Sequence, residues 1–94
     1  MGKPLPDHEV DAALKELPTW TREQKMIVRR FEFTDFSDAM VFVNKVAEAA
    51  EEANHHPNFY ISWNKVRLEL TSHDSGGITQ RDLRMARRID SIAG

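Results

Sequence analysis

The chain has 94 residues, which suits a single domain, with 40 % apolar residues for a small core and 30 % charged residues for a soluble surface. It has no cysteine, which excludes disulfides and thiolate metal sites and suits the reducing cytoplasm. Its 13 basic and 15 acidic residues give a net charge of -2, so no general attraction to nucleic acid or to a membrane is expected.

The N-terminal segment 1–6 contains two prolines and no apolar run, so it is interpreted as a flexible lead-in to a single domain over 1–94 and not as a signal peptide. Asp7 is predicted to cap a short helix, which Pro18 ends because proline cannot continue the helical hydrogen bonds. One face of this helix carries Val10, Ala13, Leu14 and Leu17. No apolar stretch of the chain is long enough to span a bilayer.

Strand-like alternation follows over 20–33, where residues 21–25 are predicted to form a turn between a short strand and a longer one. The clearest helix is predicted over 36–53, with Asp35 or Ser37 as its cap and Pro57 forcing the chain out of the helix. The predicted apolar face of this helix consists of Phe36, Ala39, Met40, Val43, Val46, Ala47 and Ala50.

Two more strands are predicted over 58–63 and 65–72, joined tightly at Asn64, and a glycine loop leads to a last helix capped by Thr79. The inner face of that helix is predicted to contain Leu83, Met85, Ala86, Ile89 and Ile92. The order α-β-β-α-β-β-α predicts an α+β fold, a four-stranded antiparallel sheet with helices packed on one face. An edge strand at 66–70 would invite a second copy to pair, so a homodimer is expected.

Three histidines stand at the ends of predicted elements: His55 and His56 close the long helix, and His73 ends the last strand. Their positions suit side chains that face a cleft. Adjacent histidines before a proline can also be a plain helix C-terminus, where imidazolium complements the helix dipole. A metal site of three histidines is less natural, because neighbouring side chains on a helix diverge by roughly 100°.

The run from Glu51 through His55-His56-Pro57 to Trp63, His73 and Asp82 resembles the signature of the pterin-4a-carbinolamine dehydratases. The resemblance covers nearly the whole chain, because it extends through 17–20, 31–33, 64–66, 71–74, 76–79 and 86–90. It implies catalysis without metal or bound cofactor. The implied reaction is the dehydration of 4a-hydroxytetrahydropterin to quinonoid dihydropterin, which supports pterin recycling for aromatic amino acid hydroxylation.

The resemblance places the three active-site histidines of the family at His55, His56 and His73, and its acidic helix residue at Asp82. Losing hydroxide from the pterin ring requires a proton on the departing oxygen, and a second group must take a proton from the ring. Histidine can do both near neutral pH, because its unperturbed pKa is about 6.5. We interpret His55 and His73 as the proton-transfer groups and His56 as the residue that orients the pterin.

The supporting residues each have two interpretations. Asp82 forms a possible capping box with Thr79 and can also fix the tautomer of a histidine, and both can hold at once. Glu51 lies one helical turn before His55 and either supports it or belongs to a solvated helix face. Trp63 either walls the pterin site or packs in the core at a strand end. Pro57 belongs to the His-His-Pro triplet that the family shares.

The last helix has a basic side formed by Arg81, Arg84, Arg87 and Arg88. No helix-turn-helix or aromatic pattern accompanies it, so a solvated face is favoured and no direct nucleic-acid binding is expected. The predicted function is therefore that of a cytoplasmic hydro-lyase, assembled as a homodimer or homotetramer. One alternative is a protein-interaction module, since some animal members of the family are dimerisation cofactors of a homeodomain transcription factor. Another is a dehydratase that acts on a different pterin.

Overall fold

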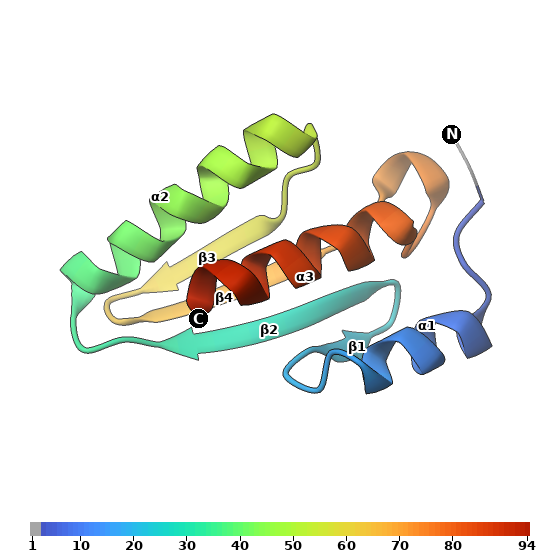
Figure 1. Cartoon of the computed structure of the whole chain (residues 1–94), viewed down its shortest axis with the longest axis horizontal. Coiled ribbons are helices and arrows are strands. Elements are labelled where there is room, and N and C mark those ends of the chain that lie inside the picture. The colour runs from blue at the N-terminus through green and yellow to red at the C-terminus, as the bar shows by residue number, and fades with distance from the viewer. Residues whose placement is uncertain (1–2) are drawn as a thin grey trace.

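The computed structural model describes residues 3–94, and whatever was predicted for residues 1 and 2 lies outside the described part. Its elements are α1 (Asp7–Lys15), β1 (Thr21–Glu23), β2 (Met26–Glu32), α2 (Phe36–Ala53), β3 (Asn58–Ser62), β4 (Lys65–Leu70), the short 3-10 helix η1 (His73–Ser75) and α3 (Gln80–Ala93) (Figure 1). Their order confirms the predicted sequence of helices and strands.

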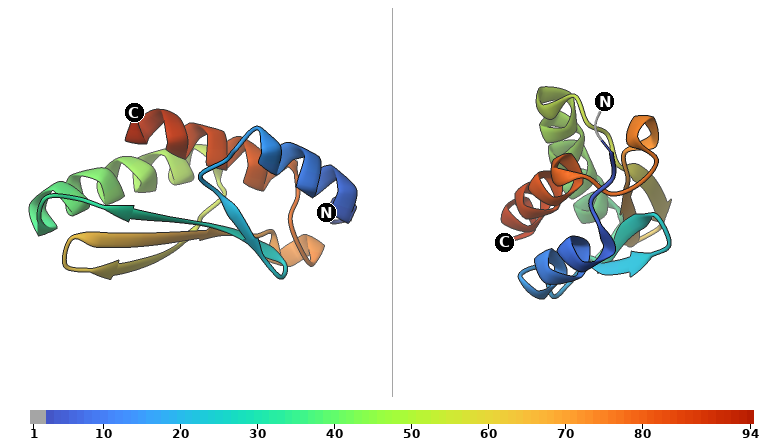
Figure 2. Two further views of the ribbon diagram at one scale, coloured as in Figure 1. Left: turned by 90° about the horizontal axis from the view of Figure 1, so that it is seen from below. Right: turned by 90° about the vertical axis from the view of Figure 1, so that its right-hand side faces the viewer.

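The four strands form one antiparallel sheet in the order β1-β2-β4-β3. All three helices lie on the same side of it, as predicted (Figure 2). The strand at 66–70 is not an edge strand, which corrects the prediction made for it. It lies in the interior of the sheet because β2 pairs along its other side, with Ile27 opposite Leu70 and Phe31 opposite Val66. The two edges of the sheet are β1 and β3.

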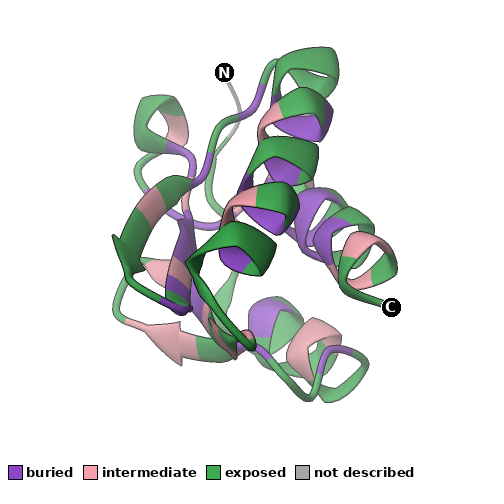
Figure 3. Ribbon diagram, turned by 90° about the vertical axis from the view of Figure 1, so that its left-hand side faces the viewer, coloured by how far each residue is buried: buried purple, intermediate pink, exposed green. Residues whose placement is uncertain are grey.

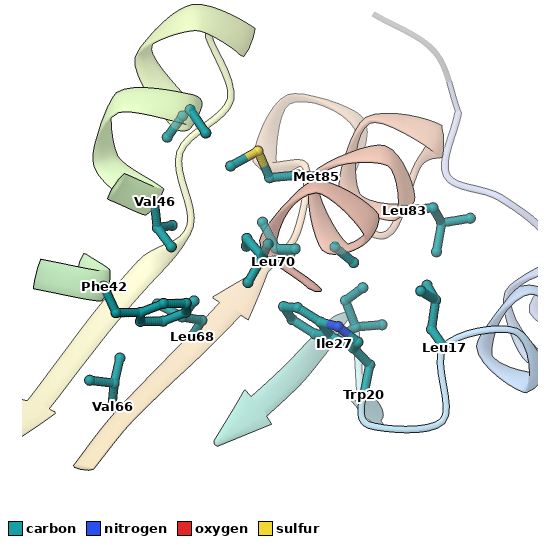
Figure 4. Packing of buried hydrophobic residues seen from close by; sticks show 14 of the residues in the cluster. Leu17, Trp20, Ile27, Phe42, Val46, Val66, Leu68, Leu70, Leu83 and Met85 are labelled. Carbon is teal, nitrogen blue, oxygen red and sulfur yellow. The ribbon is translucent and has the colours of Figure 1, made fainter. Parts of the chain in front are cut away.

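The core lies between the sheet and the helices, where β4 contributes the alternating residues Val66, Leu68 and Leu70 (Figure 4). Along α2 and α3 the buried residues form stripes that face inward, while the outer sides are exposed (Figure 3). Every predicted inner residue of α3 is buried except Ile92, which is partly buried against the core. This burial is the main source of stability in so short a chain.

The apolar face of α2 was predicted only in part. Phe36 is 50 % exposed, whereas Phe42 and Ala49, which were not in the predicted set, are buried. Phe36 is the first residue of α2, and this end of the helix lies near one end of the sheet (Figure 1). Asp35 caps the helix by accepting a hydrogen bond from the backbone N–H of Asp38 at 2.8 Å, as one of the two predictions had it.

The cap of α1 differs from the prediction. Pro6 occupies the N-cap position, and Asp7 is the first helical residue. The Asp7 carboxylate accepts a hydrogen bond from Arg22 Nη2 at 2.9 Å, so it binds a neighbouring strand instead of its own helix. Just before the helix, the backbone N–H of Leu5 donates to the carbonyl of Ile78 at 2.8 Å, which joins the N-terminal segment to the loop before α3.

The first hairpin turn is tighter than predicted, whereas the second contains two residues in place of the predicted joint at Asn64 alone. Both turns use a left-handed residue other than glycine. Residues 21–23 pair with β2, so the first turn contains only Gln24 and Lys25, and Gln24 has φ 58°. Trp63, with φ 53°, shares the second turn with Asn64. Asn64 is held from outside the hairpin, because its side-chain amide donates to the Phe33 carbonyl at 2.8 Å. Tertiary contacts thus replace the usual glycine signal.

Candidate active site

His55 lies just past the C-terminus of α2, at the point where the chain leaves the helix. Asn54 adopts the left-handed conformation (φ 51°), and the His55 backbone N–H then donates to the Ala50 carbonyl at 3.1 Å. This turn directs the His55 side chain inward, and the residue is only 8 % exposed. Its ring atom Nε2 lies 2.5 Å from Asp82 Oδ1. His55 is therefore fixed by a carboxylate and does not simply complement the helix dipole.

Asp82 is fully buried in the first turn of α3 and links three parts of the chain. Its Oδ2 accepts hydrogen bonds from the Thr79 backbone N–H and from Ser72 Oγ, both at 2.9 Å, while Oδ1 meets His55. The capping box between Thr79 and Asp82 is complete, as predicted. The same carboxylate also contacts a histidine, so the two geometries expected of Asp82 occur together.

The contact with Asp82 determines which nitrogen of His55 is free. When the Asp82 carboxylate is ionised it only accepts hydrogen bonds, and Nε2 is then the nitrogen that donates in this contact. The other ring nitrogen, Nδ1, is then the atom that can exchange a proton with a ligand. A buried carboxylate that fixes one histidine nitrogen in this way is a common arrangement in sites that transfer protons.

Ser72 is a member of this network that the sequence reasoning missed. It is 1 % exposed, and its Oγ donates to Asp82 Oδ2 and lies 2.8 Å from Thr79 Oγ1. A signal for it exists in the sequence, because Ser72 continues the two-residue alternation of Leu68 and Leu70 toward the core. A hydroxyl on a buried strand face needs a polar partner, and here that partner is Asp82.

His73 follows Ser72 directly and has the opposite environment, because it is exposed at the start of η1. An isolated bridge between Ser72 and Gly77 closes the loop around it. His73 lines an open depression of about 620 Å³, within the size range of small-molecule sites. The depression is formed by Gln24, Lys25, Met26, Asn58, Thr71, His73, Gly76 and Gly77. Nothing in the local sequence predicted that Gln24 and Lys25, in the turn between β1 and β2, would line this depression.

In the described part of the chain, the other candidate residues form no hydrogen bond with Asp82. His56 is exposed, and its Nε2 lies 2.5 Å from Glu51 Oε2, so Glu51 contacts His56 and not His55. Pro57 is buried immediately before β3. Trp63 is 66 % exposed in the turn at the opposite end of β4 from His73, so the core-packing interpretation of Trp63 is wrong. The structure does not bring Trp63 to the histidines.

A second depression, of about 370 Å³, is lined by Ala53, His55, Arg81, Arg84, Met85 and Arg88. At its rim Arg81 Nη2 donates to Asp74 Oδ1 at 2.6 Å. This hydrogen bond from Arg81 holds the pKa of the Asp74 carboxyl below its ordinary value.

Residues 3–94 show neither a metal-binding cluster nor a membrane-spanning helix. Nowhere in this part of the chain do three or more side chains of the metal-binding types gather closely enough to hold an ion. None of the helices there is both long and apolar enough to cross a membrane.

Residues 3–92 match the family described as pterin 4 alpha carbinolamine dehydratase. A provisionally named pterin-4-alpha-carbinolamine dehydratase of Koribacter versatilis is 52 % identical over 92 residues, which cover 98 % of each chain. A similarly named protein of Thermomicrobium roseum is 47 % identical over 89 residues, covering 95 % of this chain and 96 % of the relative. The chain therefore belongs to the pterin 4 alpha carbinolamine dehydratase family.

Two solved structures share the fold. A protein from Brucella melitensis, described as a transcriptional coactivator/pterin dehydratase, has a TM-score of 0.93 and 36 % identity, covering 98 % of this chain and all of that one. A pterin dehydratase-like protein described as a RuBisCO assembly factor of the alpha-carboxysome has a TM-score of 0.65 and 25 % identity, covering 80 % and 87 % of the two chains. The fold thus occurs in proteins with different described roles.

Proposed function

We propose that this chain dehydrates 4a-hydroxytetrahydropterin to quinonoid dihydropterin by histidine acid–base catalysis. The observation that carries the proposal is the buried pair of His55 and Asp82, which Ser72 joins to the strand end that bears His73. An open depression large enough for a pterin ring lies beside His73. Membership in the dehydratase family supports the choice of substrate.

The reaction needs two proton transfers. The bond between the ring carbon 4a and its oxygen breaks as that oxygen receives a proton and leaves as water, while the lone pair of the adjacent ring nitrogen forms the new C=N bond. A second group takes a proton from a ring nitrogen, which gives the neutral quinonoid product. We assign these transfers to His55, through its free Nδ1, and to His73, with the ring between them.

The remaining residues hold the site and its ligand. Asp82 keeps His55 in one orientation and stabilises its protonated form whenever His55 accepts a proton. His56, exposed and joined to Glu51, orients the pterin from the outside. Pro57 fixes the path of the chain between these histidines and β3. The product would be reduced by a separate enzyme, in support of aromatic amino acid hydroxylation.

The test is to follow the loss of 4a-hydroxytetrahydropterin absorbance by stopped flow, in EDTA, with the wild-type protein, His73→Ala and His8→Ala. His8 is a matched control because it is exposed in α1 and lines neither depression. We expect wild-type and His8→Ala to accelerate the decay equally and His73→Ala to lose about 100-fold or more of kcat. No acceleration by the wild-type protein would refute the proposal.

A binding role is the second candidate, because the Brucella protein is described as a transcriptional coactivator and another relative as an assembly factor. Phe36 and Val41 on α2 are large apolar side chains that are exposed in this chain and could contact a partner. A protein that lacks dehydratase activity but captures a partner through Phe36 or Val41 would favour this role. Phe36→Ser is the variant to compare, since Phe36 is half exposed and far from Asp82 along the chain.

Assembly as a homodimer or homotetramer, and residence in the cytoplasm, remain predictions. The free edge β3 supports self-association, because it presents Tyr60 and Ile61 as exposed apolar residues beside unpaired backbone groups. Sedimentation equilibrium of the wild-type chain would measure the assembly directly.

A further inference from the structure

The depression on the α3 side of His55 has an unusual lining for a site that handles a neutral ring. We call it the arginine groove and define it by its lining residues Ala53, His55, Arg81, Arg84, Met85 and Arg88. Its three arginines stand at positions i, i+3 and i+7 of α3, so they project from one face of the helix. Met85 and Ala53 are the apolar residues of its lining.

The charges around the groove are only partly balanced. Arg81 contacts Asp74, and Arg88 contacts Glu52, in both cases through Nη2. Both carboxylates are well exposed and neither lines the groove. Such exposed pairs contribute little and exchange partners readily. Arg84 has no ion-pair partner in the described part of the chain, residues 3–94, so the groove keeps an excess of positive charge.

The donors that remain are suited to one class of ligand. A guanidinium carries five N–H donors, and a contact through Nη2 leaves most of them available. Arginine binds phosphate and carboxylate groups through paired hydrogen bonds, more strongly than it binds neutral acceptors. The neutral hydroxylated side chain of a simple pterin would leave these donors unused. A phosphate monoester would engage them.

His55 connects the arginine groove to the proposed chemistry. The residue lines the groove, and its Nε2 is bound to Asp82, so a ligand in the groove lies against the ring whose Nδ1 is free. A phosphate held by Arg84 and Arg88 could therefore belong to the same molecule as a pterin ring that reaches His55. The groove, at about 370 Å³, is large enough for a short phosphorylated side chain.

We propose that the arginine groove binds a phosphate monoester on the side chain of the pterin substrate, so that the preferred substrate is a phosphorylated 4a-hydroxytetrahydropterin. This inference rests on the proposed dehydratase function and names the class of substrate for it. Arg84 is the specificity-determining residue, because its guanidinium has no carboxylate to compete with the ligand. Arg88 and Arg81 contribute to the same positive field.

The kinetic test uses two forms of 4a-hydroxytetrahydropterin, one with a side chain that ends in a phosphate monoester and one with a neutral hydroxylated side chain. The proteins are wild-type, Arg84→Gln and Arg87→Gln. Arg87 is the matched control, because it is exposed on the same helix but does not line the groove. We expect wild-type kcat/KM to favour the phosphorylated form by about tenfold or more, chiefly through KM.

Arg84→Gln is expected to lose most of this preference, about tenfold, by losing activity on the phosphorylated form alone, while Arg87→Gln keeps it. Equal kcat/KM on the two forms for the wild-type protein would overturn the inference and leave the dehydratase proposal intact. An equal loss of preference in Arg87→Gln would also overturn it, because the general charge of α3 would then explain the effect.

A binding measurement keeps the inference testable if no dehydration of either form is found, which is the result that refutes the proposed function. Calorimetry would compare the oxidised pterin with a phosphorylated side chain, the oxidised pterin with a neutral side chain, and inorganic phosphate alone. The phosphorylated pterin should bind about tenfold more tightly than either, and Arg84→Gln should remove the difference. Equal binding of the two pterins, or equally tight binding of inorganic phosphate alone, would overturn the inference.

Discussion

His55 contacts Asp82, and His73 follows Ser72 of the same network, yet the surroundings of the two histidines differ in nearly every respect. His55 is buried, and a fully buried carboxylate fixes its ring. His73 is exposed at the mouth of an open depression, at the start of a single 3-10 turn. A buried polar group must form its hydrogen bonds within the folded chain, whereas an exposed polar group can bond to water until a ligand binds. Substitutions in the buried network around His55 should therefore lower stability, whereas a substitution of His73 should lower mainly activity.

The largest effect is expected for Asp82→Ala, which removes the partner of His55, Ser72 and the Thr79 backbone at once. Breaking a buried polar network of this kind should lower the free energy of unfolding by about 3–5 kcal/mol. Urea denaturation would measure it. Asp82→Asn keeps the shape but removes the charge, so it should cost less than Asp82→Ala and more than the loss of an exposed pair. Similar, small losses in both variants would show that the buried network does not stabilise this end of the sheet.

Ser72→Ala should have the next largest effect. The variant leaves Asp82 Oδ2 with the Thr79 backbone N–H but without the serine hydroxyl, at an expected cost of about 1–3 kcal/mol. If Ser72 also positions His55 through Asp82, the pH dependence of kcat should shift in this variant, and Ser72→Thr should restore it. A loss of stability with an unchanged pH profile would limit Ser72 to a structural role.

A much smaller effect is expected at the exposed pair of Glu51 and His56, although its distance of 2.5 Å equals that between His55 and Asp82. Solvent screens exposed pairs, so Glu51→Gln should change the free energy of unfolding by no more than about 0.5 kcal/mol. The comparison with Asp82→Asn isolates burial as the variable. A cost in Glu51→Gln that equals the cost in Asp82→Asn would contradict this account of the two regions.

The smallest effect is expected for Asp74 beside His73. The hydrogen bond from Arg81 lowers the pKa of Asp74 in the folded chain, so this carboxylate stabilises the fold above its unfolded pKa. That contribution is lost as the pH falls through the lowered pKa. Asp74→Asn should therefore melt slightly below wild-type at pH 7, and the difference in Tm should vanish in strong acid. A difference in Tm that persists or grows in acid would show that the hydrogen bond from Arg81 to Asp74 is not its cause.

The helices show how much the sequence predicts by itself. The predicted range 36–53 agrees with α2, and Thr79 caps α3 with Asp82 as expected. Helix signals depend on residues three or four positions apart, so the local sequence contains them. Within α2, the same signal placed Phe36 in the core, where it is half exposed. The periodicity shows which side of the helix faces the core. It does not show where along the helix the sheet that covers this side ends.

The candidate site was predictable as a set of residues and not as an arrangement. The resemblance to the family selected the three histidines and Asp82, but no pattern paired Glu51 with His56 or placed Trp63 in an exposed turn. No pattern predicted the hydrogen bond between Ser72 and Asp82 either. These contacts depend on how the end of α2, the end of β4 and the start of α3 meet in space.

The sequence alone determined the elements of this protein, the α+β class and the residues that mark its family. Only the tertiary structure decided that β4 lies inside the sheet, that His55 is buried against Asp82 while His73 is exposed, and that three arginines of α3 gather beside His55. The physical reason is the distance along the chain between the residues that interact. Capping and periodicity act between close neighbours, whereas the pairing of β2 with β4 and the burial of Asp82 depend on segments far apart in the chain.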